Sequence, residues 1–228
     1  MVKVVRKPWG YEYPLFESKD VGLWVLKLLP NQSTSLHCHP KKKTGLVVLS
    51  GRVKVDFLND STLLSASGRV IIRPGLFHRS TALSDEPAFL LEIESPRDKA
   101  DLVRFEDRYG REAEPYEDDT HVYNSESTEL PLLNLDALSN TTQRVGEALI
   151  SRRRLRSATD TLDLGENSTI LVLQGSMKSH NHTIVGPGDV VPIPTLKRLS
   201  GRFEIDDVLD VLIIVGADVT TISANQSH

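Results

Sequence analysis

The chain has 228 residues, of which 39% are hydrophobic and 25% are charged, and its formal net charge is −4 at pH 7. This composition is ordinary for a globular protein, and the acidic balance excludes the basic surface with which proteins bind nucleic acid. The single cysteine, Cys38, excludes an internal disulfide and a cysteine-based zinc site. Because no stretch is long and apolar enough for a membrane span or a signal sequence, we expect a cytoplasmic protein without a membrane partner.

Short apolar runs separated by turn residues fill the region from 21 to 95. Residues 21–29 and 45–49 are mostly apolar, and residues 53–57 alternate apolar and charged side chains as a half-buried strand does. A further apolar run covers 88–93. Strands at this spacing, with no long helix between them, predict an all-β antiparallel barrel or sandwich.

Two histidines, His37 and His39, are one residue apart at the end of a strand-like run, and His78 follows a Pro-Gly turn at 74–75. Positions i and i+2 of a strand point to the same face, so His37 and His39 can aim at one point inside a barrel. With His78 on a paired strand, they would form a set of three neutral imidazoles. Such a set suits a divalent metal ion with open coordination positions: zinc, manganese, nickel or iron.

The region from 96 to 145 is acidic and polar, which predicts a linker between two barrels. We expect an N-terminal barrel over 1–115, a linker over 116–145 and a second barrel over 146–228. The second half repeats the first. The aligned segments are 44–51 with 168–175, 61–74 with 181–194, and 88–94 with 210–216.

The metal-ligand pattern is not repeated in the second half. Thr161 and Asp163 fall near the places of His37 and His39, and Arg198 falls near the place of His78. We therefore expect the metal only in the first barrel. The second barrel is expected to serve stability and assembly.

Two motifs resemble those of the cupin superfamily, HCHPKKKTGLVVLSG (37–51) and GRVIIRPGLFHR (68–79). The resemblance implies two tandem cupin barrels (double-stranded β-helices), the second one degenerate, with His37, His39 and His78 as metal ligands. Thr44 stands where the family usually has a glutamate ligand. The site is then a three-histidine site, or another carboxylate substitutes, or no metal is bound.

The flanking strings KPWGYE (7–12) and DLVRFEDRYGR (101–111) resemble those around the C-terminal cupin of type II mannose-6-phosphate isomerases. This resemblance implies a metal-dependent isomerase or epimerase whose carbohydrate substrate is a sugar phosphate or a nucleotide sugar, in polysaccharide biosynthesis. By analogy with other cupins we expect a homodimer. Two alternatives stay open: a non-catalytic sugar-binding or regulatory bicupin, and a three-histidine Fe(II) oxygenase.

Glu92 and Lys27 are the candidate catalytic residues, since each interrupts an apolar strand. If its strand phase faces the pocket, Glu92 is a general base or a replacement metal ligand; otherwise it lies on a solvated outer face. Lys27 would neutralise an oxyanion or a phosphate, with the same ambiguity of face.

Four further residues are candidates for substrate binding. Lys43 lies in a lysine-rich loop after His39 and would attract an anion at the barrel mouth, or it is simply solvated. Arg73 and Arg79 flank the second motif and are candidate phosphate ligands. Trp9 either stacks on a sugar ring or packs against the barrel.

Overall fold

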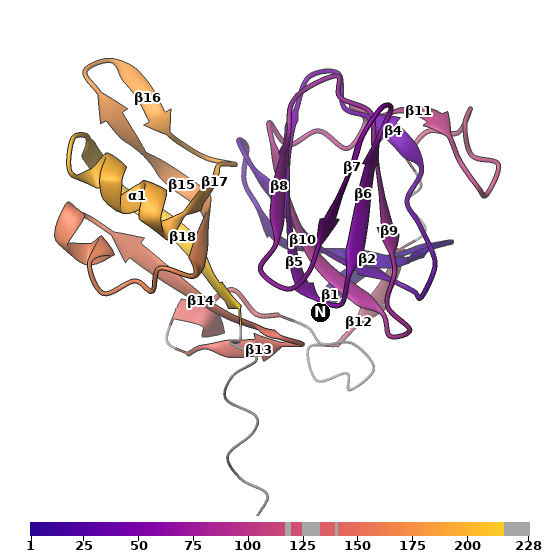
Figure 1. Ribbon diagram of the computed structural model, residues 1–228, viewed down its shortest axis with the longest axis horizontal. Coiled ribbons are helices and arrows are strands. Elements are labelled where there is room, and N and C mark those ends of the chain that lie inside the picture. The colour runs from indigo at the N-terminus through magenta and orange to yellow at the C-terminus, as the bar shows by residue number, and fades with distance from the viewer. Residues whose placement is uncertain (117–119, 125–132, 140, 217–228) are drawn as a thin grey trace, which may run out of the picture.

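Antiparallel strands make up most of the regular structure in the computed structural model, which describes residues 1–116, 120–124, 133–139 and 141–216 (Figure 1). They form two units that lie side by side. The strands of the first unit are β1 (Val2–Lys7), β2 (Gly10–Glu17), β3 (Gly22–Leu28), β4 (Leu36–Cys38), β5 (Lys43–Ser50), β6 (Val53–Phe57), β7 (Ser61–Leu64), β8 (Arg69–Ile72), β9 (His78–Ala82), β10 (Ala88–Ser95), β11 (Val103–Glu106) and β12 (Thr120–Tyr123).

The first unit is a barrel of two sheets. A seven-stranded sheet has the order β12-β1-β2-β3-β10-β5-β8, and a five-stranded sheet has the order β11-β4-β9-β6-β7. Trp24, Leu26, Leu46, Val48 and Leu90 of the larger sheet pack in one apolar cluster with side chains of the smaller sheet. Two members of this cluster, Trp9 and Leu26, also line a pocket together with charged side chains.

The second unit is a single sheet with the order β13-β14-β18-β15-β16, to which β17 adds by pairing with β15. A short helix, α1, packs on one face of the sheet, where Ile193 and Leu196 join the apolar cluster of Ile170, Val172 and Val211. The elements are η1 (Ala137–Ser139), β13 (Gln143–Val145), β14 (Ala148–Leu155), η2 (Ala158–Thr161), β15 (Ser168–Ser179), β16 (His182–Val185), β17 (Val190–Pro192), α1 (Ile193–Ser200) and β18 (Glu204–Gly216).

The predicted repeat is present in the strand pairing. β15 pairs with β17 and β18 as β5 pairs with β8 and β10, and β14 pairs with β18 as β3 pairs with β10. The register corrects the third aligned segment by one residue. Val48 pairs with Leu90 and Val172 pairs with Val211, so Glu92 corresponds to Ile213 rather than to Ile214.

The strands that carry the histidines have no counterpart strand in the described part of the second unit. In chain order, η2 occupies the place of β4 and α1 occupies the place of β9. The second cupin is therefore degenerate, as predicted: it keeps one sheet of the double-stranded helix and covers that sheet with helical turns.

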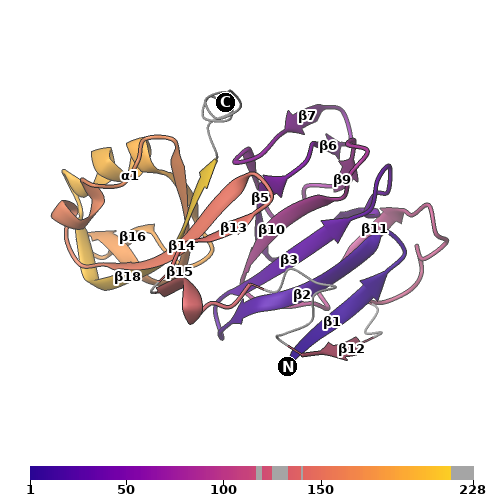
Figure 2. The same cartoon turned by 90° about the horizontal axis from the view of Figure 1, so that it is seen from below.

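The two units share an apolar core, and their sheets lie next to each other in Figure 2. Val47, Leu91 and Ile93 on the outer face of the first barrel cluster with Leu171 and Leu212 of the second unit. The central strands β5 and β10 are thereby buried on both faces, which explains why residues 45–49 are continuously apolar rather than alternating.

The all-β prediction is confirmed, and the segment predicted as a linker contributes a strand to each unit. Within 116–145, β12 pairs with β1 and β13 pairs with β14. Among the described residues no helix has the length and apolar character needed to cross a membrane.

Candidate functional site

Three histidines meet inside the first barrel. His37 on β4 is directly opposite His78 on β9, and His39 follows β4 on the same face as His37. The ring centroids of His37 lie 4.9 Å from His39 and 4.4 Å from His78, and those of His39 and His78 are 5.4 Å apart. One ring nitrogen from each of the three lies within 4.8 Å of the others, so these nitrogens can share one metal ion.

Backbone carbonyls fix the orientation of all three rings. The Nδ1 atom of His37 lies 2.9 Å from Ser35 O, that of His39 lies 2.6 Å from Asp101 O, and that of His78 lies 3.0 Å from Leu76 O. A carbonyl oxygen only accepts, so each Nδ1 is the protonated nitrogen. Each Nε2 then offers a lone pair, which is the arrangement found in histidines that bind metals.

The surroundings keep these imidazoles neutral. Burial is the largest cause in each case: it holds the pKa of His37 well below its ordinary value and lowers the pKa of His39 to about 3 and that of His78 to about 4. Lys42 adds to the effect for all three, and neighbouring histidines add to it for His37 and His39. Neutral imidazole is the form that binds a metal ion, and the Nε2 atom of His39 is buried without a hydrogen-bond partner. The residues therefore fit a divalent metal ion.

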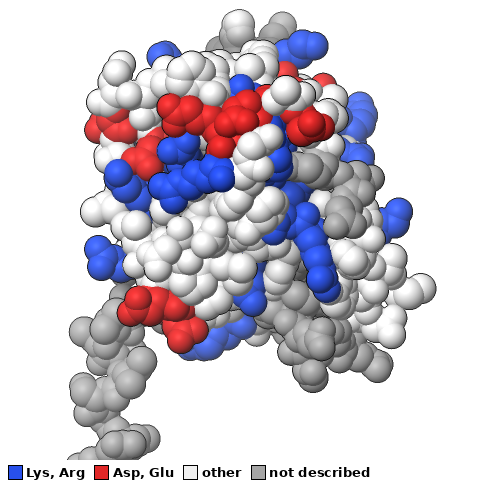
Figure 3. All heavy atoms as spheres, turned by 90° about the vertical axis from the view of Figure 1, so that its right-hand side faces the viewer, with Lys and Arg blue, Asp and Glu red and all other residues white. Residues whose placement is uncertain are grey.

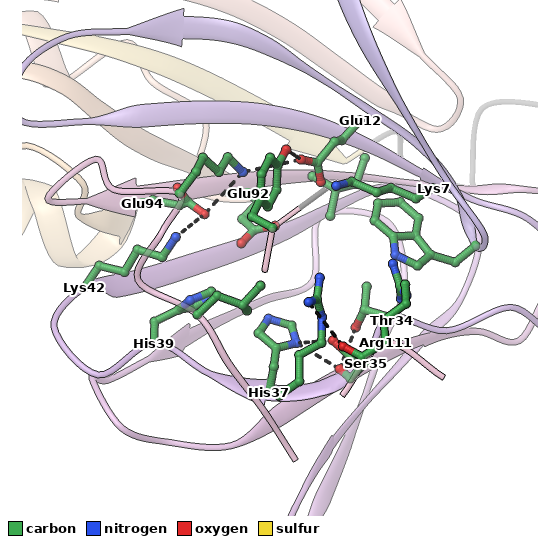
Figure 4. A pocket seen from close by; sticks show the side chains of 16 residues that line it. Lys7, Glu12, Thr34, Ser35, His37, His39, Lys42, Glu92, Glu94 and Arg111 are labelled. Atoms are coloured by element: carbon green, nitrogen blue, oxygen red, sulfur yellow. Dashed lines mark hydrogen bonds and ion pairs between the residues drawn. The ribbon is translucent and has the colours of Figure 1, made fainter. Parts of the chain in front are cut away.

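Three glutamates face His37 and His39 across the pocket: Glu12 on β2 and Glu92 and Glu94 on β10 (Figure 4). Glu92 and Glu94 belong to the strand phase that points inward with Leu90, and both line the pocket. Burial, with Glu94 nearby, raises the pKa of Glu92 to about 7. A carboxyl group that titrates near neutrality is suited to proton transfer.

Two lysines offset the negative charge of these glutamates. The Lys42 ammonium donates to Glu94 Oε1 at 2.8 Å and to Asp98 O at 3.0 Å, and its side chain is only 1% exposed. Lys99 Nζ lies 3.5 Å from both Glu12 Oε1 and Glu94 Oε1 and stacks 3.7 Å from the Trp24 ring centroid. Burial lowers the pKa of Lys99. The nearby carboxylates of Glu12 and Glu94 raise it by more, so the pKa lies above its ordinary value. Lys99 is therefore a cation in the pocket.

The segment after β10 covers the pocket. Leu102, Arg104, Arg111 and Tyr116 from this segment line it together with Lys7. The Tyr116 hydroxyl donates to Glu12, and the Lys7 ammonium lies 3.8 Å from the Tyr116 ring centroid. On the side of the molecule turned away from the second unit, acidic and basic side chains lie next to one another (Figure 3). The pocket thus offers both cations for an anionic group and carboxylates for hydroxyl groups.

Lys27 and Lys43, two of the predicted site residues, do not line the pocket. On β3 the inward residues are Trp24 and Leu26, so Lys27 points to the outer face, 5.4 Å from the Tyr11 ring centroid and 5.7 Å from that of Phe89. Lys43 forms an ion pair with Asp189 of the second unit. Strand alternation places Lys27 outside the pocket, and Lys43 bridges the two units.

Arg79 and Arg73 also lie outside the pocket, whereas Trp9 lies within it. Arg79 follows His78 on β9 and points to the opposite face, where it pairs with Glu106 at 2.9 Å. Arg73 is exposed in the turn after β8. Trp9 is 5% exposed and lines the pocket, so the placement required for contact with a sugar is present.

Most of the charged lining was not identified from the sequence. Lys42 was one of three lysines in the loop after His39, and its burial depends on Glu94 and on Asp101, whose Oδ2 accepts from the Lys42 amide at 3.0 Å. A signal existed for five others. The strings KPWGYE and DLVRFEDRYGR contain Lys7, Glu12, Asp101, Arg104 and Arg111, whereas Glu94, Lys99 and Tyr116 lie outside both strings.

The two-sheet barrel with its inward histidines has the cupin fold, and the second unit repeats its strand frame in degenerate form. Residues 1–107 match the family described as "Mannose-6-phosphate isomerase C-terminal". The resemblance predicted from the flanking strings is confirmed.

Curated relatives match about half of the chain. The Xanthan biosynthesis protein XanB of Xanthomonas campestris pv. campestris (strain B100) is 30% identical over 113 residues, which are 47% of this chain and 23% of that protein. Mannose-1-phosphate guanylyltransferase ManC of Salmonella typhimurium is 29% identical over 117 residues, 49% of this chain and 24% of that protein. The chain therefore spans about a quarter of the length of the curated relatives it matches.

Among solved structures, an uncharacterized conserved protein with a double-stranded β-helix domain from Klebsiella pneumoniae is 24% identical, with a TM-score of 0.41. The match covers 45% of this chain and 91% of that one.

Proposed function

We propose that the first barrel is the active site of a metal-dependent isomerase or epimerase that acts on a sugar phosphate or a nucleotide sugar. The observation that carries this proposal is the set of three Nδ1 hydrogen bonds to backbone carbonyls, which leaves three Nε2 lone pairs for a metal ion. Three glutamates lie opposite His37 and His39 (Figure 4). The substrate class is supported by the family matched over residues 1–107 and by relatives named for xanthan biosynthesis and for mannose-1-phosphate guanylyltransfer.

His37, His39 and His78 would hold the metal ion. A divalent ion bound there supplies Lewis-acid polarisation of a carbonyl or hydroxyl oxygen. Moving the carbonyl of an aldose to the neighbouring carbon requires a base that takes a proton from one carbon and returns it to the next. Glu92 lines the pocket and has a pKa near neutrality, so this role is assigned to Glu92.

Binding of the anionic substrate is assigned to cations of the pocket rather than to the outer arginines. Lys7, Arg104 and Arg111 line it on the segments that flank the cupin motifs. Arginine in such a position can bind phosphate oxygens with two parallel hydrogen bonds. Trp9 offers an aromatic face in the same pocket for the apolar side of a sugar ring.

The test combines metal analysis with a solvent-exchange assay. Purified protein is expected to contain zinc, manganese or nickel, and phosphorylated aldoses incubated with it in D2O are expected to gain deuterium at the carbon next to the carbonyl. The variant H37A/H39A is expected to lose both properties. Absence of metal after loading with each ion would favour the binding module, and iron with oxygen uptake would favour the oxygenase; either result would refute the isomerase.

A further inference from the structure

Glu94 has one oxygen that is held by a partner and one that is not. Oε1 accepts from Lys42 at 2.8 Å and has Lys99 at 3.5 Å. Oε2 is buried and has no hydrogen-bond partner, in a residue that is 1% exposed. A buried carboxylate oxygen without a partner is costly, so the site is suited to an additional cation or proton at Oε2.

His39, which lies near Glu94, also has an unshared electron pair. Ligand atoms of His39, Glu92 and Glu94 lie within 4.8 Å of one another. Asp101 O accepts the hydrogen of His39 Nδ1, so His39 Nε2 carries a lone pair, and this atom is buried without a partner too. Two such acceptors cannot satisfy each other. A shared metal ion would satisfy both.

We infer that Glu94 is a carboxylate ligand of the metal ion held by the histidines, an inference that rests on the proposed metal centre. Lys42 holds Oε1 and leaves Oε2 as the oxygen available to a metal ion, as an outer-shell partner holds a ligand. Glu94 is the cross-strand partner of Thr44, whose hydroxyl oxygen is likewise buried and unpartnered. The carboxylate is thus supplied from β10, next to a position on β5 where threonine offers only a weak ligand.

Glu92 and Glu94 then have separate roles, although both point inward from one strand. Glu92 is less buried than Glu94, and the proton transfer is assigned to it. Glu94 is engaged by Lys42 and Lys99 and contributes to the metal centre. This separation provides a matched pair of variants, because Glu92→Gln and Glu94→Gln remove the same charge two residues apart.

The experiment measures binding of Mn²⁺ and Zn²⁺ alone, by titration calorimetry, to the full chain stripped of metal with a chelator. Wild type is expected to bind one ion per chain. E94Q is expected to raise the Kd by ~100-fold or more, whereas E92Q should change it by less than ~5-fold. Equal Kd values for E94Q and wild type would overturn the inference.

A second pair of variants guards against a folding defect, because E94Q leaves the buried Lys42 ammonium without its carboxylate. K42M/E94Q removes both charges, and K42M alone retains Glu94. Weaker binding by K42M/E94Q than by K42M supports the inference, and equal binding overturns it while the histidine centre stands. If H37A and H39A bind as tightly as wild type, the proposed metal centre itself fails, and the inference fails with it.

Discussion

The two units use one strand frame for opposite purposes. In the first barrel β4 and β9 bring His37 and His78 together, and β10 turns Glu92 and Glu94 inward. At the corresponding places in the second unit stand η2 and α1, and β18 presents Ile213 and Val215. The second unit therefore has an apolar core where the first has a polar pocket.

This difference shows which part of the fold carries chemistry and which carries stability. Burying an aliphatic side chain stabilises a protein by about 1.5–3 kcal/mol, so the cluster around Ile193, Leu196 and Ile213 is a source of stability. Buried groups such as His39, Lys42 and Glu94 are a cost unless they are paired or bind a cation. The shared apolar interface lets the second unit support a pocket that is costly to form.

Removal of the second unit gives the largest expected effect. A chain that ends at residue 116 would expose Val47, Leu91 and Ile93, which now pack against Leu171 and Leu212. We expect this truncation to lose cooperative thermal unfolding and to aggregate, because a sheet face that is buried becomes exposed. A truncated chain that stays monomeric and unfolds cooperatively would show that the second unit is dispensable.

Glu92→Gln tests the chemical side of the comparison. The change keeps the shape of the side chain and removes the base, so we expect kcat to fall by about 100- to 10,000-fold. Steady-state kinetics with the best substrate of the exchange assay provides the measurement. The matched control is Ile213→Val at the corresponding place in the second unit, where kcat should not change. A normal kcat in E92Q would assign the proton transfer to another group.

Arg152→Met tests the main buried ion pair that the structure describes in the second unit. Arg152 donates to both oxygens of Asp210, at 2.9 and 2.7 Å, and Asp210 is 4% exposed. Loss of the partner should lower the free energy of unfolding by about 2–4 kcal/mol, somewhat less than for an isolated pair because Arg154 lies 3.5 Å from Asp210.

The neighbouring Arg153→Met is the control for this prediction. Arg153 pairs with Asp163 on the surface, where both side chains are about half exposed or more, and solvent screening leaves such a pair with little effect. Urea unfolding of both variants separates the cases. Equal midpoints for R152M and R153M would contradict a structural role for the buried pair.

Gly45→Ala has the smallest expected effect and tests how closely the units fit. A Cβ atom at Gly45 would lie 2.5 Å from Val190 Cγ2 and 2.9 Å from Ile93 Cγ2. We expect the free energy of unfolding to fall by about 1–3 kcal/mol from overpacking. Val190→Ala should relieve this cost in the double variant, so the two changes should not add. Additive losses would mean that β5 and β17 adjust independently.

Periodicity and spacing predicted much that concerns single strands. The alternation in residues 53–57, the apolar runs at 45–49 and 88–93, and the His37–His39 spacing each depend on near neighbours in the chain. These predictions are confirmed by the strands β6, β5 and β10 and by the close approach of the three imidazoles. The strand face occupied by a single charged residue is harder to predict, because Glu92 and Lys27 each interrupt an apolar strand in the same way.

By itself, then, the sequence determined the all-β class, the repeated frame and the convergence of His37, His39 and His78, since these follow from strand period and turn position. Only the tertiary structure decided that Glu92 and Lys42 enter the pocket while Lys27, Arg79 and Lys43 leave it. The physical reason is burial on both faces. Where a second sheet covers the outside of a barrel, both strand phases are apolar, and the pattern no longer distinguishes inside from outside.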